Sequence, residues 1–215
     1  MRPERVPVAK EGWPFIFFAA GSSVIFALLQ WEIPAVAALA VTAFVLYFFR
    51  DPERVVPDGK GLLVSPADGK IIEIVQAREG ALSSQAATRV SIFMNVFNVH
   101  VNRFPVTGIV KRIEYQPGSF LPADKKNALI RNEQNRLLVE DELGYEITVV
   151  QVAGLVARRI VCWAETGDKL KRGQRFGLIR FGSRLDIYLP PQYSVCVKQG
   201  SRVWAGQTVV AETKI

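Results

Sequence analysis

The sequence contains few residues of the kinds that build metal centres and disulfide frameworks. Its 215 residues include two cysteines, Cys162 and Cys196, and one histidine, His100. The cysteines lie within apolar segments and lack the paired spacing of a zinc site or a redox motif. We therefore predict two buried free thiols, a reducing compartment and no metal site. Any imidazole acid or base chemistry must use His100.

Charge is also scarce in residues 13–49, where Glu32 is the only charged residue. The stretch from Trp13 to Trp31 is uncharged, and as a helix it would be about 28 Å long, enough to cross a hydrocarbon core of roughly 30 Å. The following run, 35–49, would be about 22 Å long and is short for a full crossing. The tryptophans at the two ends of the first run suit a membrane interface.

Basic residues lie before the first run and after the second, whereas the turn between the runs has none. The positive-inside rule therefore places both termini in the cytoplasm, with the two runs forming a helical hairpin in the membrane. A cleaved signal peptide is the alternative, because Ala35-Val36-Ala37 resembles a cleavage site, but the apolar sequence continues past it to Phe49. The flanking basic residues are Arg2, Arg5, Lys10, Arg50 and Arg54.

Beyond the hairpin, apolar and β-branched segments alternate with turn residues, which is the pattern of β-strands. Residues 122–142 are polar, and we expect an insert-like segment whose ends join the sheet. The chain is thus expected to have four parts: a polar N-terminus at 1–12, a membrane-anchoring helical hairpin at 13–49, a linker at 50–61 and a β domain at 62–215.

The net charge of +7 favours an anionic partner, such as nucleic acid, a phospholipid surface or an acidic substrate. The basic residues do not form a dense run with interleaved aromatic residues, so nucleic acid is not specifically indicated.

Two short motifs each occur twice. The sequence GDKLKRGQ at 167–174 is echoed by GSRVWAGQ at 200–207, and PADGKI at 66–71 is paralleled by PVTGIV at 105–110. Paired units of this kind resemble the barrel-sandwich architecture of lipoyl and biotinyl domains. The predicted fold class is therefore mainly β and barrel-sandwich-like, with an N-terminal helical membrane hairpin. Such a resemblance concerns the fold and does not by itself give the function.

Three positions could carry chemistry, and each also has an ordinary structural interpretation. Gly182-Ser183 lies between two strand-like segments, and it is either a plain turn or a strained reactive centre. His100 is either a partly exposed histidine or a general base. Asp68, which precedes a glycine, is either a turn residue or the carboxylate that orients the imidazole of a base-activated serine. The surroundings of Ser183 lack the second glycine of the G-x-S-x-G motif.

Several motifs, in this order along the chain, resemble the phosphatidylserine decarboxylase family in its short prokaryotic form. They are FFRDPER at 48–54, SPADGKI at 65–71, MNVFNVHVNRFPVTG at 94–108, QVAGLVARRIVCW at 151–163 and RFGSRLDIYLP at 180–190. The family usually has Asn-Glu-Arg-Asn where this chain has Asn132-Glu133-Gln134-Asn135, so no role is assigned to the position of the missing arginine.

The resemblance implies a proenzyme that cleaves itself. Ser183 would attack the carbonyl group of Gly182, with His100 as the base and Asp68 orienting the imidazole. Elimination and hydrolysis would then leave a covalent pyruvoyl group, the cofactor, at position 183. The mature enzyme would be a heterodimer of chains 1–182 and 183–215, the second of 33 residues, with further oligomerisation left open.

The implied reaction converts phosphatidylserine, an anionic phospholipid, to phosphatidylethanolamine at the cytoplasmic face of the cell membrane. The pyruvoyl carbonyl would capture the serine amine and accept the electrons released with carbon dioxide, as pyridoxal phosphate does elsewhere. His100 is the candidate donor of the proton that replaces carbon dioxide. Arg103, Arg158 and Arg159 are candidates for binding the phosphate.

Two alternatives remain open at this point. The first is decarboxylation of a related lipid such as archaetidylserine, because the headgroup chemistry is the same and the tails lie in the bilayer. The second is a non-enzymatic membrane-tethered barrel-sandwich adaptor, in which Gly182-Ser183 is a hairpin turn. A lipoyl or biotinyl carrier is disfavoured, since it needs a modifiable lysine where this chain has Gly-Ser.

Overall fold

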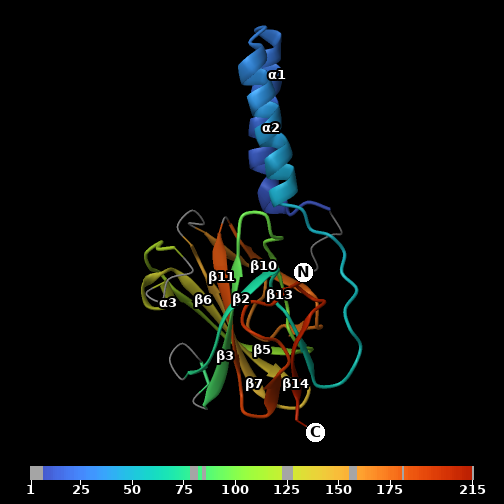
Figure 1. The fold of residues 1–215 in the computed structure, drawn as a ribbon, viewed down its shortest axis with the longest axis vertical. Helices are drawn as coiled ribbons and strands as arrows, with labels where there is room; N and C mark the ends of the chain where they lie inside the picture. The colour runs from blue at the N-terminus through green and yellow to red at the C-terminus, as the bar shows by residue number, and fades with distance from the viewer. Residues whose placement is uncertain are drawn as a thin grey trace. The chain divides into compact units, whose positions relative to one another are not determined.

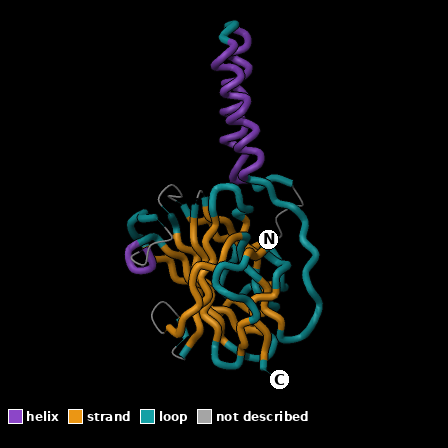
Figure 2. The backbone as a smooth tube through the Cα atoms, viewed as in Figure 1, coloured by secondary structure: helices purple, strands orange, loops and turns teal. Residues whose placement is uncertain are grey.

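The computed structural model describes residues 7–77, 82–83, 86–122, 128–154, 159–180 and 182–214. The chain divides into two compact units, Met1–Glu53 and Arg54–Ile215. The first unit is a pair of helices and the second is built mainly of strands (Figures 1 and 2). The prediction of a mainly β protein with an N-terminal helical hairpin is confirmed.

The helical unit consists of a short 3-10 turn, η1 (Lys10–Gly12), followed by α1 (Trp13–Leu28) and α2 (Glu32–Phe48), which lie side by side. Its base is closed by Phe49, whose carbonyl oxygen accepts a 2.8 Å hydrogen bond from the Ala9 amide. Gly12 lies against the Phe49 ring, where a Cβ atom would clash. This close approach explains the glycine at the start of α1.

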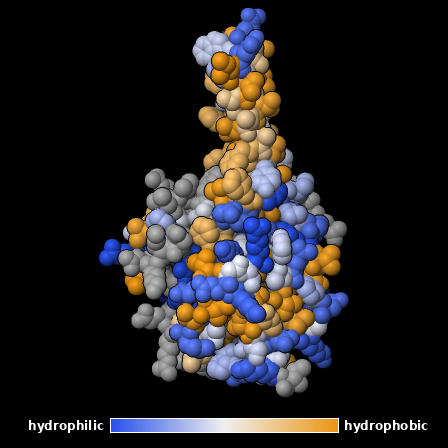
Figure 3. Space-filling model, in the orientation of Figure 1, coloured by the Kyte–Doolittle hydropathy of each residue, from blue (hydrophilic) through white to orange (hydrophobic). Residues whose placement is uncertain are grey.

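Many large apolar side chains of the hairpin are exposed, and the face of the hairpin seen in Figure 3 is largely apolar. Phe18 is 79% exposed and Ile33 is 84% exposed. Lys10–Leu28, at 19 residues, is long and apolar enough to cross a membrane, whereas Glu32–Phe48 is a shorter apolar helix. An exposed apolar surface of this size needs a lipid or protein cover, and the first helix indicates membrane association.

The second unit contains three sheets whose strands pair antiparallel. The largest is a curled half-barrel with the strand order β13-β2-β3-β11-β7-β6-β5-β9, and the two small sheets have the orders β1-β14-β12 and β4-β10-β8. The strands are β1 (Leu62–Val64), β2 (Gly69–Ala77), β3 (Ala87–Met94), β4 (Val101–Arg103), β5 (Gly108–Gln116), β6 (Gln134–Asp141), β7 (Glu146–Val152), β8 (Ile160–Cys162), β9 (Lys169–Leu170), β10 (Arg175–Ile179), β11 (Ser183–Leu189), β12 (Tyr193–Val195), β13 (Arg202–Val203) and β14 (Val209–Thr213), with one short helix, α3 (Ala128–Arg131).

The sequence repeats correspond to an internal symmetry of the large sheet. One half has the order β13-β2-β3-β11, the other has the order β9-β5-β6-β7, and the halves meet where β11 pairs with β7. The registers of the two edges match, since Gly69 pairs with Val203 just as Gly108 pairs with Leu170. A Cβ atom on either glycine would clash with a carbonyl oxygen of the neighbouring strand. The repeated glycines are therefore required by the spacing of the strands.

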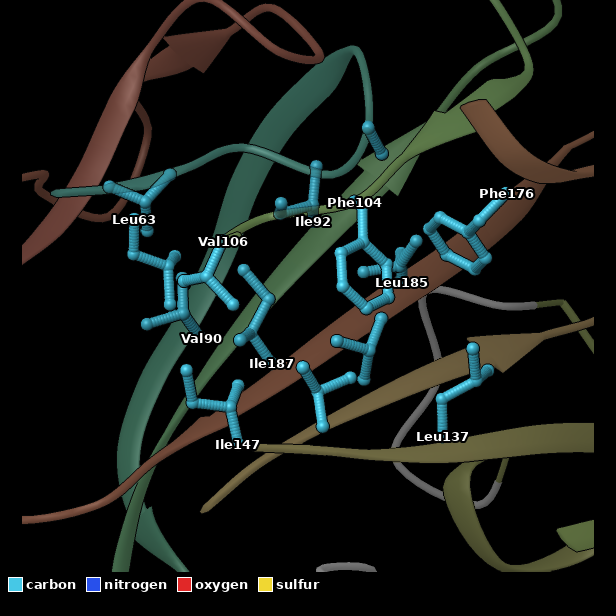
Figure 4. Packing of buried hydrophobic residues seen from close by; sticks show 14 of the residues in the cluster. Leu63, Val90, Ile92, Phe104, Val106, Leu137, Ile147, Phe176, Leu185 and Ile187 are labelled. Atoms are coloured by element: carbon cyan, nitrogen blue, oxygen red, sulfur yellow. The ribbon is translucent and has the colours of Figure 1, made fainter. Parts of the chain in front are cut away.

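The core lies on the inner face of the curled sheet, and β11 contributes Leu185, Ile187 and Leu189 to it, all fully buried. Figure 4 shows Phe104 and Phe176 beside Leu185. The two phenyl rings meet edge to face, with centroids 6.1 Å apart and planes at 74°, an arrangement that aromatic pairs prefer.

The outer face of β11 is also buried, and it carries an ion pair. Arg184 Nε lies 2.7 Å from Asp186 Oδ1, and the same guanidinium donates a 2.7 Å hydrogen bond to Ser91 Oγ on β3. Burial raises the pKa of Asp186, and the adjacent Arg184 opposes that rise. Because β11 is buried on both faces, a change in its register would expose apolar groups and bury unpaired charge.

Two local predictions can be compared with the structure. The end of the expected insert-like segment joins the sheet, since residues 134–141 form β6, an inner strand of the large sheet, while residues 123–127 lie outside the described residues. Cys162 is half-buried as a free thiol, but Cys196 is exposed, so the prediction of two buried cysteines is wrong for Cys196. Among the residues that the structure describes, there is no cluster of three potential metal ligands.

The expected linker is bound to the β unit by Arg172. Its Nη1 donates to the carbonyl oxygens of Gly59 at 2.8 Å and Leu62 at 3.0 Å, and its Nη2 donates to that of Pro57 at 2.6 Å. One guanidinium therefore orders the segment that leads into β1.

We predict that Arg172→Met releases residues 57–62 and lowers stability by about 2 kcal/mol, because three hydrogen bonds from a cation are lost. Hydrogen exchange followed by mass spectrometry should show faster exchange in this segment, with a lower melting temperature. Lys171→Met, which removes the neighbouring exposed charge, is the control and should change neither quantity. Equal exchange in the two variants would contradict the role of Arg172.

Candidate active site

Ser183 is the first residue of β11 and follows a glycine in the left-handed conformation, Gly182, with φ of +62°. Its side chain is fully buried, and its hydroxyl donates to Met94 Sδ at 3.9 Å. A thioether sulfur is a weak acceptor, so the hydroxyl proton is held loosely. The flanking residue Phe181 lies outside the described residues.

His100 lies at the end of the turn that follows β3. Its side chain is 3% exposed, and its Nδ1 is 2.9 Å from the carbonyl oxygen of Asn98. Because a carbonyl oxygen can only accept, this contact assigns the proton of the neutral ring to Nδ1 and leaves Nε2 as the basic nitrogen.

The fold brings the backbones of His100 and Ser183 to the same end of the β unit. Ser183 pairs with Met94, which begins the turn that ends at His100. The carbonyl oxygen of His100 accepts a 3.4 Å hydrogen bond from the amide of Ile179, the last residue of β10, and β10 leads into Gly182. The strands β3 and β10, together with the turn between β3 and β4, therefore position His100 and Ser183, the base and the serine predicted from the sequence.

Asp68 is buried on a neighbouring loop, and it binds other groups. Its Oδ2 accepts from Arg54 Nη2 at 2.8 Å, and its Oδ1 accepts from the Ala205 amide at 2.7 Å. The loop lies against the strand that follows His100, since the Arg103 amide donates to the Pro66 carbonyl oxygen at 2.9 Å. Within the described residues, the Asp68 carboxylate thus binds Arg54 and the backbone amide of Ala205. The His100 ring is oriented by the carbonyl oxygen of Asn98.

The three arginines considered for phosphate binding have different environments. Arg103 is 4% exposed, and its Nη1 donates to the Gly173 carbonyl oxygen at 3.1 Å. Arg159 is exposed, and its carbonyl oxygen accepts from the Arg180 amide at 3.3 Å. Arg158 lies outside the described residues. Arg103 therefore holds one of the repeated turns, and Arg159 remains as a surface cation.

A chain of buried amides next to Ser183 was not predicted from the sequence. Asn135 Nδ2 donates to Gln151 Oε1 at 3.0 Å, Gln151 Nε2 donates to Asn102 Oδ1 at 2.8 Å, and Asn102 Nδ2 donates to Met94 Sδ at 3.8 Å. The last acceptor is the sulfur that Ser183 also contacts. The three amides are almost fully buried. A polar residue at a core-facing position of an apolar strand, as at Gln151, is the signal that could have revealed them.

This amide chain fits closely against β10. A Cβ atom at Gly177 would lie 3.0 Å from Gln151 Nε2 and would clash with the Val161 carbonyl oxygen. Burial raises the pKa of the Cys162 thiol on β8, and the Asn135 side chain opposes that rise. The thiol is thus protonated at neutral pH, which makes it an unreactive neighbour of the amide chain.

Comparison with known proteins identifies the family of the chain. The sequence pattern of the family described as phosphatidylserine decarboxylase matches residues 41–211. The chain belongs to the phosphatidylserine decarboxylase family. The resemblance inferred from the sequence motifs is thereby confirmed.

Three bacterial relatives, each named phosphatidylserine decarboxylase proenzyme, match nearly the whole chain. The protein of Geotalea uraniireducens is 49% identical over 210 residues, which are 98% of each chain. The protein of Desulfotalea psychrophila is 50% identical over 212 residues, 99% of each chain. The protein of Geobacter sulfurreducens is 50% identical over 215 residues, 98% of each chain.

We predict that Gln151→Leu destabilises the β unit by roughly 3 kcal/mol, because it leaves buried polar atoms of Asn102 and Asn135 without their partner. Thermal unfolding in detergent measures the effect. Thr148→Val on the opposite face of β7 removes one hydrogen bond, from the Leu82 amide, and should cost about 1 kcal/mol. An equal loss of stability in the two variants would contradict the larger contribution expected from the amide chain.

Proposed function

We propose that this chain decarboxylates phosphatidylserine to phosphatidylethanolamine with a pyruvoyl group that it makes from Ser183 by self-cleavage. The observation that carries the proposal is the buried serine directly after a left-handed glycine, at the start of a central strand. The membership of the family and the name proenzyme given to the relatives support it.

Self-cleavage begins when His100 Nε2 takes the proton of Ser183 Oγ, and the oxygen attacks the carbonyl carbon of Gly182. The C–N bond breaks, the protonated imidazole returns its proton to the departing amine, and the two residues are joined by an ester. Glycine favours this step because it adopts a positive φ without strain and has no Cβ in the path of the hydroxyl.

The ester then breaks by elimination. A base removes the Cα proton of residue 183, and the Gly182 carboxylate leaves with the C–O bonding electrons. The dehydroalanine that remains tautomerises to an imine, and water hydrolyses it with release of ammonia. The products are chains 1–182 and 183–215, and the pairing of β11 with β3 and β7 keeps the shorter chain in the core.

The surroundings of residue 183 fit a pyruvoyl group. The group is small and occupies the place of the serine, and among the described residues no heavy atom lies within 4 Å of a Cβ built on Gly182. When formed, the pyruvoyl group supplies an electron-withdrawing carbonyl that accepts the electrons released with carbon dioxide. His100 supplies the proton to the carbon that lost carbon dioxide.

A lipid substrate accounts for the presence of the apolar hairpin. We propose that α1 and α2 hold the enzyme at the bilayer, with the β unit on the cytoplasmic side, as the basic residues before and after the hairpin favour. The enzyme then acts on the lipid headgroup without extracting the lipid tails from the membrane.

Ser183→Ala should abolish both chain cleavage and decarboxylation, because the alanine has no hydroxyl to attack or to convert. A denaturing gel and intact mass should show two chains for wild type, the shorter of 33 residues, and one full-length chain for the variant. Ser194→Ala on β12 serves as a control and should mature normally. An uncleaved wild type without decarboxylase activity would exclude this function and favour a tethered adaptor.

His100→Gln should stop self-cleavage, because the amide cannot take the serine proton. For Asp68 we propose that the carboxylate exchanges Arg54 for the His100 ring during cleavage. Asp68→Asn should then slow cleavage about 100-fold, as loss of general base assistance does, and shift its pH profile.

Arg54→Met separates this role from a structural one, because it removes the partner of Asp68 and keeps the carboxylate. If Asp68 serves only to bind Arg54, Asp68→Asn and Arg54→Met should lower the melting temperature alike and leave the pH profile of cleavage unchanged. That result would remove Asp68 from the mechanism and leave His100 in place.

A further inference from the structure

A hollow of about 460 Å³ lies at the end of the large sheet where β3 stops and β2 begins. Lys70 and Arg202 are its charged lining residues, and Phe97 and Trp204 are its exposed aromatic ones. Phe93, Asn95 and Asn98 also line it. The hollow was not among the sites inferred from the sequence.

The two cations lie side by side. Arg202 of β13 pairs with Lys70 of β2, so both side chains leave the same face of the sheet on adjacent strands. In the described part of the chain, neither side chain takes part in an ion pair. Two cations that repel each other without a carboxylate between them favour an anion at this position.

The other half of the sheet shows that the scaffold does not require these charges. Ile109 and Lys169 occupy the positions equivalent to Lys70 and Arg202, because they pair in the same register. The partner of Ile109 on β6 is Glu140, whereas the partner of Lys70 on β3 is Phe93. The equivalent place thus combines one cation with one carboxylate, and the uncompensated pair is specific to the half that contains β11.

The aromatic residues give the hollow an apolar rim. Phe97 is 63% exposed and Trp204 is 51% exposed. Phe97 is held outward by a tight turn, in which its amide donates to Asn95 Oδ1 and the Asn95 amide donates to Asn98 Oδ1, both at 2.9 Å. Exposed aromatic rings beside basic residues are typical of proteins that contact the interfacial layer of a bilayer.

The hollow lies at the same end of the large sheet as the candidate active site. Phe93 and Asn95 flank Met94, which pairs with Ser183, and the carbonyl of Asn98 binds the His100 ring. Lys70 lies two strands from β11, which is about 10 Å across a sheet. Its side chain leaves the face opposite to that of Ser183, because Lys70 pairs with Phe93 and Phe93 with Arg184, whereas Ser183 pairs with Met94. Both positions lie at the end of the sheet, so a headgroup that passes around the ends of β3 and β11 can bring its amine to residue 183 and its phosphate to these cations.

We propose that Lys70 and Arg202 bind the phosphate of a phospholipid headgroup at the bilayer surface, while Phe97 and Trp204 enter the interfacial layer. This site rests on the proposed function, since it positions the lipid whose serine amine reacts at residue 183. It replaces Arg103, which is buried, as the principal phosphate ligand.

The test uses the full chain in mixed detergent micelles that contain phosphatidylserine. The double variant Lys70→Ala with Arg202→Ala should raise the KM for phosphatidylserine about tenfold or more, as loss of hydrogen bonds to an anion does. Self-cleavage should stay at the wild-type rate, because it involves no phosphate. Lys70→Arg with Arg202→Lys should restore most of the affinity.

The matched control removes the same charge from the other edge of the sheet, with Lys111→Ala and Lys169→Ala, and should leave KM unchanged. Phe97→Ser with Trp204→Ser should raise KM for long-chain phosphatidylserine and spare monomeric dihexanoyl phosphatidylserine. The cation variant should raise KM for both lipids. A cation variant that affects the long-chain lipid alone would indicate general attraction to the membrane and would overturn the headgroup site.

The outcomes separate this inference from the proposed function. A wild type that neither cleaves itself nor decarboxylates phosphatidylserine refutes the function. An active wild type whose KM is unchanged in the cation variant refutes the phosphate site alone. If the double variant fails to mature, Lys70→Gln and Arg202→Gln are measured singly, and loss of self-cleavage in these variants as well would also overturn the site.

Discussion

Strand β11 is buried on both faces between β3 and β7, and the rest of the β unit depends on that burial. Its inner face supplies three fully buried aliphatic residues, and its outer face supplies the Arg184–Asp186 ion pair. The pairing on both sides fixes the register of the strand, and so fixes where its first residue, Ser183, lies. A break of the chain before Ser183 would cost little packing, because the contacts of β11 are made by residues that follow it.

The position proposed to react lies where the two halves of the large sheet meet. β10 belongs to the small sheet β4-β10-β8, whereas β11 is the strand through which one half of the large sheet pairs with the other. Gly182, directly before β11, has a left-handed backbone. The halves share a scaffold but differ in side chains, since one edge presents Lys70 and Arg202 where the other presents Ile109 and Lys169. The two halves therefore share one backbone arrangement, and the cation pair proposed to bind the headgroup phosphate belongs to the half that contains β11.

Polar groups inside the unit are numerous, and the described structure pairs most of them with one another. The amides of Asn102, Gln151 and Asn135 form one chain, and Asp68 joins Arg54 to the backbone at Ala205. Buried amides that satisfy each other cost little and restrict the side chains to one arrangement. The loosely held hydroxyl of Ser183 contrasts with them, because its acceptor is a sulfur atom. The rigid surroundings thus hold a reactive group that is itself weakly bound.

Much of the architecture could be predicted from local patterns. The uncharged run that begins at Trp13 predicted the helical pair, since an apolar run of that length has few other stable structures. The repeated glycine motifs predicted a β fold, because their turn chemistry is local. The 122–142 segment was predicted in part, since its end was expected to join the sheet, but its polar sequence did not show that β6 is an inner strand between β5 and β7. Cys196 was misjudged for the converse reason, as an apolar stretch does not say which face of a short strand is covered.

The sequence by itself determined the family, and it singled out Gly182-Ser183 as the proposed cleavage site and His100 as the candidate base, because these depend on residue identity and order. Only the tertiary structure decided which groups meet. In the folded protein, Asn98 orients the His100 ring and Asp68 forms an ion pair with Arg54. Arg103 is buried, and Lys70 lies beside Arg202. Lys70 and Arg202 are about 130 positions apart in the chain, and such a pairing is set by sheet order and register, which no local pattern encodes.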